Sequence, residues 1–222
     1  MREAFRRKGL EEAWDRVIAV VVQPGVEFNN DSVFEYDRAQ AGDLSRWILS
    51  VPGLVFEAHS TDYQTGKALR RMVEDHFCIL KVGPALTFAF REAVFALDRI
   101  EEELIPLPGG RARIREHLDL VMREEPAHWK PYSKGSEEQQ RFLRSFGYSD
   151  RSRYYWALPL LQQRLRVLMT NLSVGDVPLT LLSQYLPRQY EAVRNGSLAR
   201  TPQAWIRHRI REVVEMYARA CS

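Results

Sequence analysis

The residues best suited to chemistry lie where three predicted strands end. They combine acidic, basic, amide and hydroxyl side chains with one glycine, and they are Gln23, Glu27, Glu57, His59, Ser60, Asp62, Lys81, Gly83 and Thr87. In parallel α/β proteins, ligands bind beyond the carboxyl ends of the strands. This set therefore predicts a site for a phosphorylated polar ligand, whose phosphate or sugar part these residues would bind.

The turn at Gly83 is the clearest local indication of phosphate binding. Gly83 allows the backbone to approach a ligand closely, and Pro84 fits a first helical turn without losing a needed N–H group. The free amides of that turn, which extends to Thr87, favour an anion, and Lys81 adds a positive charge. A helix that starts here without a ligand would have the same sequence, so both interpretations stay open.

His59 is the best candidate for acid–base chemistry or for a metal ligand. A histidine with a purely structural role is an equally good interpretation. Its neighbour Ser60 does not indicate a nucleophilic triad, because the members of a triad come from distant segments. The other four histidines show no metal-binding pattern; they are His76, His117, His128 and His208.

Glu57 lies within an apolar strand, where a carboxylate needs a partner. Lys81, on the next predicted strand, is the expected partner. The pair would be either a structural ion pair or part of the site.

Three short apolar runs predict the strands that position these residues, and they cover residues 17–22, 54–58 and 77–82. The first run has six consecutive apolar residues, most of them β-branched, which is typical of a strand buried on both faces. Helical spacing predicts helices after each strand, over residues 39–49, 65–73 and 85–104. This alternation predicts an α/β fold with a parallel sheet and right-handed crossovers.

The pattern becomes helical and loop-rich after residue 106. Helices are expected over residues 113–122, 158–172, 178–185, 187–193 and 202–219, and residues 125–149 read as an irregular segment. We therefore expect residues 1–110 to form three β/α units. Residues 111–222 would form a helical C-terminal region packed on the same domain.

The composition favours a soluble protein of a reducing cytoplasm. The chain has 222 residues, a net charge of +3 and 27% charged residues, without a block of lysine and arginine, so nucleic acid is not an expected partner. Cys78 and Cys221 are too far apart to suggest a disulfide framework or a metal motif. The charged N-terminus is unlike a signal peptide, and no apolar stretch is long enough to span a membrane.

Several longer stretches together resemble one family. They are Glu-Ala-His-Ser-Thr-Asp-Tyr-Gln-Thr at 57–65, Asp-His-Phe at 75–77, Ile-Leu-Lys-Val-Gly-Pro-Ala-Leu-Thr-Phe at 79–88, Ser-Asp-Arg at 149–151, Arg-Tyr-Tyr-Trp at 153–156 and Ser-Gln-Tyr-Leu-Pro at 183–187. In order and over essentially the whole chain, they are similar to the accessory, non-catalytic subunit of class II D-tagatose-1,6-bisphosphate aldolase. The same family is also labelled tagatose-6-phosphate kinase.

The resemblance implies a (β/α)8 TIM-type barrel and a cytoplasmic role in the breakdown of tagatose, galactitol or N-acetylgalactosamine. It implies that the chain supports the activity and stability of a separate catalytic subunit, which uses zinc to cleave tagatose 1,6-bisphosphate. Zinc is therefore expected in that partner rather than in this chain. The kinase label has no support from a P-loop motif.

Two departures from the family qualify these expectations. The similarity covers only the second half of family members, and three strands fall short of the eight of a full barrel, so we expect a partial barrel of about the last three units. An unpaired sheet edge would favour self-association or pairing with another chain. Only His59 offers a zinc-binding imidazole at a strand end.

Three interpretations of function stay open. The chain is an accessory subunit, an enzyme in its own right (an aldolase or a sugar-phosphate kinase), or an inactive remnant. The scarcity of histidines at the strand ends favours the first.

Overall fold

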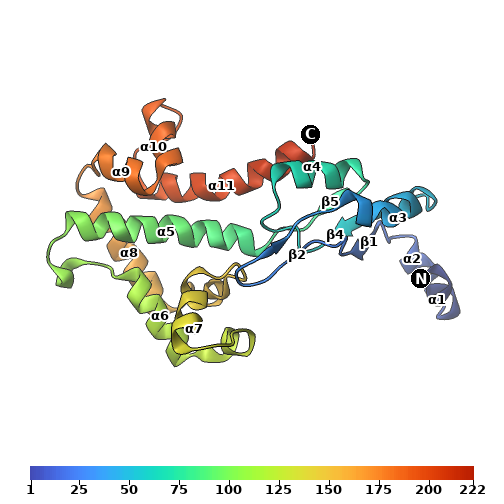
Figure 1. Ribbon diagram of the computed structural model, residues 1–222, viewed down its shortest axis with the longest axis horizontal. Coiled ribbons are helices and arrows are strands. Elements are labelled where there is room, and N and C mark those ends of the chain that lie inside the picture. Colours follow the sequence, from blue (N-terminus) through green and yellow to red (C-terminus); the bar gives the residue numbers. More distant parts are fainter. The chain divides into compact units, whose positions relative to one another are not determined.

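The computed structural model describes residues 1–222 and divides into two compact units (Figure 1). The first, here called the sheet unit, comprises Met1–Phe28, Ser32–Gly83 and Met216–Ser222. The second, the helical unit, comprises Asn29–Asp31 and Pro84–Glu215. The predicted division at residues 110 and 111 follows the change of sequence pattern and stays a prediction.

The sheet unit contains a three-stranded parallel sheet in the order β1-β4-β5. The strands are β1 (Ala19–Val22), β4 (Val55–Ala58) and β5 (Ile79–Leu80). They lie within the predicted runs but are shorter. The mixed α/β character and the parallel sheet are therefore confirmed.

The helices of the sheet unit are α1 (Arg2–Arg7), α2 (Glu11–Trp14), α3 (Arg38–Leu49) and α4 (Gly66–Glu74). The last two begin at side chains that bind their free amides. The carboxylate of Asp37 accepts a hydrogen bond from Ala39 N at 2.9 Å before α3, and the hydroxyl of Thr65 accepts one from Ala68 N at 3.1 Å before α4. Such N-caps fix where each helix starts.

One face of the sheet carries the core of this unit. Phe56 is 1% exposed and stacks between Trp47 and Phe77, with ring centroids 5.8 Å and 5.6 Å away. Val21 and Glu57 are paired in register and point to the opposite face. Val21 is 56% exposed, so that second face is only partly covered within this unit.

A short antiparallel hairpin follows β1. Its strands are β2 (Glu27–Phe28) and β3 (Val33–Phe34). Each has two residues, too few for a recognisable alternation of polar and apolar side chains.

The helical unit contains α5 (Pro84–Leu104), α6 (Ile114–Glu124), α7 (Glu137–Phe146), α8 (Pro159–Ser173), α9 (Leu179–Tyr185), α10 (Pro187–Arg194) and most of α11 (Pro202–Ala220). Short 3-10 turns are η1 (Pro108–Gly110), η2 (Pro126–His128), η3 (Lys130–Tyr132) and η4 (Arg151–Tyr154). All but α7 match predicted helices to within a few residues. No helix of the chain combines the length and apolar character needed to cross a bilayer.

Helix α7 lies in the segment that we expected to be irregular. Ser136 and Gln139 form a capping box at its start, in which each side chain binds the backbone N–H of the other residue. This serine followed three residues later by glutamine is a recognised start signal, and it was missed in the sequence.

The aromatic segment near residue 150 is part of the core of the helical unit. Asp150 is fully buried, and its Oδ1 accepts hydrogen bonds from Arg91 at 2.7 Å and from Ser152 at 2.8 Å. Trp156 packs edge-on against Phe90. These contacts give the segment a structural role.

Candidate functional site

At the first strand end, the polar side chains form hydrogen bonds within their own turn. The side-chain amide of Gln23 donates to Val26 O at 3.1 Å and also to the carboxylate of Glu27. The other carboxylate oxygen of Glu27 accepts a hydrogen bond from Phe28 N at 2.9 Å. Gln23 and Glu27, two of the predicted site residues, thus contact each other, and their hydrogen bonds stay within the turn that contains them.

At the second strand end, Glu57 lies against His59. Glu57 Oε1 is 2.7 Å from His59 Nε2, and the two side chains are 30% and 29% exposed. Residues two apart on a strand point to the same face, which brings them together. The expected pairing of Glu57 with Lys81 is wrong, because Lys81 is exposed and forms no ion pair. A carboxylate that orients an imidazole in this way could support general-base chemistry.

The loop after β4 is anchored to the turn after β5. Thr61 Oγ1 donates to Lys81 O at 2.7 Å, and Asp62 Oδ1 accepts from Gly83 N at 2.8 Å. Thr61 and Asp62 are 0% and 3% exposed. In the turn for which phosphate binding was one of two open interpretations, the Gly83 amide therefore already has a carboxylate partner inside the protein.

Two residues of this loop adopt left-handed backbone conformations without being glycine. Ser60 has φ of 57° and Tyr63 has φ of 64°. Such conformations are uncommon for non-glycine residues and persist only where the surroundings impose them. Between these two residues, Thr61 and Asp62 anchor the loop by buried hydrogen bonds.

Two further side chains hold this loop, and sequence reasoning did not select either. Gln64 is buried, accepts a hydrogen bond from Tyr36 N and donates one to Phe34 O, both at 2.9 Å. The Tyr217 hydroxyl donates to Thr61 O at 2.7 Å. Burial raises the pKa of Tyr217, so the phenol stays protonated and remains a donor. Gln64 lies within a family motif, but nothing local links Tyr217 to a loop 156 residues earlier.

The third strand end leads directly into α5. Gly83 has open space where a Cβ would stand, so neither crowding nor a positive φ demands glycine there. Pro84 is the first residue of α5, as predicted. Thr87 belongs to the helical unit, and its hydroxyl donates to Pro84 O at 3.1 Å within the first turn.

The candidate residues do not form a zinc site. Catalytic zinc sites use three protein ligands. His59 and Glu57 supply two, and no group of three or more histidine, cysteine, aspartate or glutamate side chains is placed to hold a metal ion.

The fold and the strand-end loops define the class of this protein: a mixed α/β protein whose polar loops follow three parallel strands. The family model described as "D-tagatose-1,6-bisphosphate aldolase subunit GatZ/KbaZ-like" matches residues 1–222. The chain belongs to this family of aldolase subunits, and the resemblance inferred from its motifs is confirmed.

A solved structure agrees with this assignment. The chain is similar to a protein from Sinorhizobium meliloti 1021 whose crystal structure is described as that of "a probable tagatose 6 phosphate kinase". The two share 48% sequence identity with a TM-score of 0.94, over 99% of this chain and 57% of the other. The chain thus spans little more than half the length of that relative.

Proposed function

We propose that this chain is an accessory, non-catalytic subunit of a zinc-dependent class II D-tagatose-1,6-bisphosphate aldolase. It would support the activity and stability of the catalytic subunit in the cytoplasm, in the breakdown of tagatose, galactitol or N-acetylgalactosamine. The observation that carries the proposal is the internal use of the strand-end polar groups, above all the hydrogen bond from Gly83 N to Asp62. A loop whose carboxylate is bound to the amide of the neighbouring turn is better suited to support a structure than to turn over a substrate.

The metal chemistry would come from the partner. His59 and Glu57 alone do not complete a zinc coordination set. We therefore place the zinc, and the cleavage of the sugar bisphosphate, in the catalytic subunit.

We also propose that β1, β4 and β5 belong to a (β/α)8-type barrel. Their parallel order with intervening helices supports this. So does the exposure of Val21 on the face opposite the core, because parallel sheets are normally covered on both faces. Strands from a further segment or from a second chain would cover that face.

The accessory role can be tested by mixing the purified chain with a family-matched catalytic subunit. We expect the two to co-elute on size exclusion at micromolar concentrations. We also expect a longer half-life of aldolase activity at elevated temperature than with an equal mass of serum albumin. Failure to associate, together with an unchanged half-life, would contradict the proposal.

One observation favours a second candidate, an enzyme in its own right. The His59–Glu57 pair, about one-third exposed, has the form of an oriented base. Turnover of tagatose 1,6-bisphosphate, or phosphorylation of tagatose 6-phosphate, by the isolated chain would establish this candidate if His59→Gln abolished it.

A further inference from the structure

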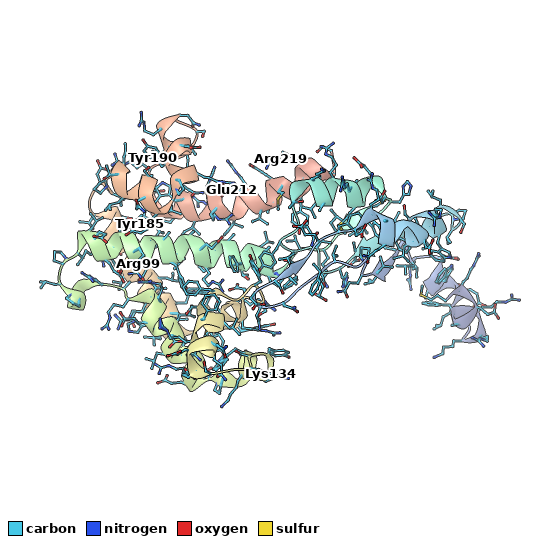
Figure 2. All side chains as sticks on the ribbon, viewed as in Figure 1. Arg99, Lys134, Tyr185, Tyr190, Glu212 and Arg219 are labelled. Atoms are coloured by element: carbon cyan, nitrogen blue, oxygen red, sulfur yellow. The ribbon has the colours of Figure 1, made fainter.

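The helical unit contains a groove with a volume of about 680 Å³. This is within the range of about 300–1,000 Å³ that is typical of small-molecule sites. The groove is lined by residues of α5, α6 and α7 and by Arg113, which directly precedes α6. Its lining is rich in basic side chains, namely Arg99 (Figure 2), Arg113, Arg115, His117, Arg123 and Arg141. The only acidic side chains in the lining are Glu116 and Asp119. The lining therefore has five arginines against two carboxylates. Glu116 forms an ion pair with Arg113, and Asp119 forms one with Arg123.

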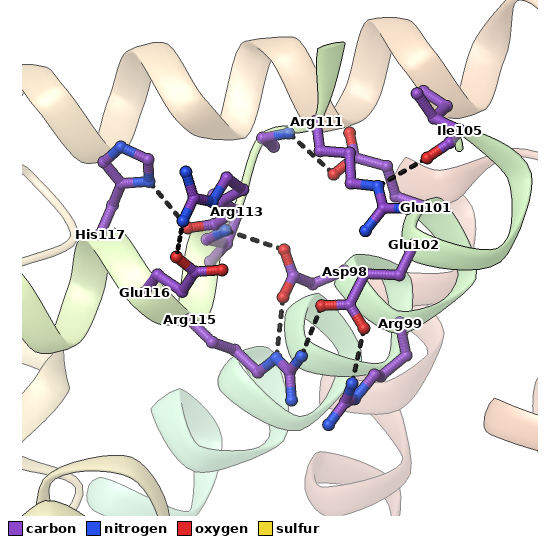
Figure 3. Close-up of polar contacts among 12 residues, drawn as sticks. Asp98, Arg99, Glu101, Glu102, Ile105, Arg111, Arg113, Arg115, Glu116 and His117 are labelled. Atoms are coloured by element: carbon purple, nitrogen blue, oxygen red, sulfur yellow. Dashed lines mark hydrogen bonds and ion pairs between the residues drawn. The ribbon is translucent and has the colours of Figure 1, made fainter. Parts of the chain in front are cut away.

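Carboxylates of α5 hold two of these arginines in place (Figure 3). Asp98 accepts from Arg115 Nε at 2.8 Å, and Glu102 accepts from Arg115 Nη2 at 2.7 Å. Glu102 also accepts from Arg99 at 2.6 Å. A guanidinium has five N–H donors, so each of these arginines keeps donors for a ligand while its position is fixed.

Arg113 is held by a strained backbone. Its φ of 51° and ψ of 48° lie in the left-handed region, although it is not glycine. The flanking amides are fixed, since Ala112 N donates to Glu101 and Ile114 N donates to Asp98, both at 2.8 Å. Both carboxylates are buried. Strain of this kind is concentrated at ligand and active sites.

The remaining lining offers a free cation and an aromatic surface. Arg141 on α7 is exposed and forms no ion pair. Phe146, which is 50% exposed, meets Phe95 edge to face at 6.1 Å between ring centroids. An apolar surface beside several guanidinium groups suits an organic molecule with phosphoryl groups better than it suits a bare ion.

We propose that this groove binds a small organic ligand that carries two or more phosphoryl groups. Guanidinium groups match phosphate in a bidentate geometry and keep their charge at all relevant pH values. The phosphoryl groups would contact Arg141 and the N–H donors that Arg113 and Arg123 keep beside their ion pairs with Glu116 and Asp119. The organic part would lie over Phe146. None of these residues belongs to the strand-end loops, so the inference is independent of the proposed aldolase role.

The test is calorimetric titration of the full chain with three probes. Tripolyphosphate presents phosphoryl groups alone, ATP adds an aromatic base, and fructose 1,6-bisphosphate places two phosphates on a sugar. We expect saturable binding of at least one organic probe, tighter than that of inorganic phosphate and weakened by added salt. The preferred probe identifies the organic part of the ligand.

Matched variants locate the binding. Arg123→Gln with Arg141→Gln should raise the Kd of the preferred probe at least tenfold. Arg207→Gln removes one charge from an exposed position of α11 outside the groove and should leave it unchanged. Arg113→Asn removes a third cation, and asparagine tolerates the left-handed backbone, so a folded variant is expected. Circular dichroism and melting curves check that each variant is folded.

Three results would overturn the inference. The first is no saturable binding of any probe at millimolar concentration. The second is equal weakening by Arg207→Gln and by the groove variants. The third is binding of polyglutamate but of none of the phosphorylated probes, which would indicate an acidic protein surface as the occupant.

Discussion

Asp62 Oδ1 accepts a 2.8 Å hydrogen bond from the backbone N–H of Gly83, and this contact ties the loop after β4 to the turn after β5. The Asp62 side chain is almost fully buried, so water cannot replace the contact at little cost. The interaction occupies the backbone N–H of Gly83, in the turn where the sequence left phosphate binding open.

Replacing Asp62 with alanine should destabilise the protein. Hydrogen bonds to a charged group contribute about 1.5–3 kcal/mol, and the variant would leave the Gly83 amide without this acceptor. The free energy of unfolding from urea titration measures the loss.

Asp43→Ala is the matched control for this experiment. The Asp43 side chain is 95% exposed and pairs only with exposed Arg46, so a change of less than about 0.5 kcal/mol is expected. Equal effects of the two substitutions would show that the bond to Gly83 contributes little.

Arg91→Met should destabilise the helical unit, and by more than the loss expected for Asp62→Ala. Arg91 and Asp150 are both buried, and losing one partner of a buried ion pair costs about 3–5 kcal/mol because the other charge is left unpaired. Adding Asp150→Asn should restore part of the lost stability, since no buried charge then remains. A double-mutant cycle based on thermal unfolding gives the coupling. A double variant less stable than Arg91→Met would contradict this account.

Adjacent carboxyls on α5 should contribute to stability with opposite dependence on pH. Burial raises the pKa of Glu101 above its usual 4.5, against the opposing hydrogen bonds from Asn171 and Ala112. Burial also acts to raise the pKa of Glu102, but Arg99 and Arg115 together hold it below the usual 4.5.

The direction of each pH dependence is set by whether the folded or the unfolded state binds the carboxyl proton more tightly. The folded state protonates Glu101 more readily than the unfolded state does. Its contribution to the free energy of unfolding is therefore greatest below pH 4.5 and falls as pH rises through the raised pKa. The contribution of Glu102 is present above pH 4.5 and is lost as pH falls through the lowered pKa.

Urea titrations between about pH 3 and pH 7 on Glu101→Gln and Glu102→Gln test this pair. The advantage of the wild type over Glu101→Gln should shrink as pH rises, and its advantage over Glu102→Gln should grow. Slopes of the same sign for the two variants would refute the assignment.

His59→Gln should leave the stabilisation of a catalytic aldolase subunit unchanged. An accessory role does not require the His59 imidazole, whereas an enzyme that used it as a base would lose activity by two or more orders of magnitude. The half-life of the partner's aldolase activity, with wild type or variant added, is the measurement. Glu57→Gln serves as a companion variant and should behave in the same way.

Elements with a local signal could be predicted from the sequence. Three apolar runs located the three strands, and Pro84 marked the start of α5. The capping box at Ser136 also marked a helix, although the surrounding glycine and aromatic residues obscured it.

The side-chain partners of the candidate site residues could not be predicted from the sequence. The sequence suggested Lys81 as the partner of Glu57. The alternation of side chains along β4 instead places His59 beside it. The left-handed backbone of Ser60 and the hydroxyl of Tyr217 depend on contacts made after folding. Neither has a counterpart in residue type or spacing.

The chain passes between the sheet unit and the helical unit four times, after residues 28, 31, 83 and 215. Neither unit is therefore a continuous stretch of the gene, and no single cut can release either one whole. A fragment ending at residue 83 would lack the final segment from Met216, and with it the Tyr217 hydroxyl that binds Thr61. Deletion studies of this protein will therefore report on both units at once, and point substitutions are the cleaner means of separating their roles.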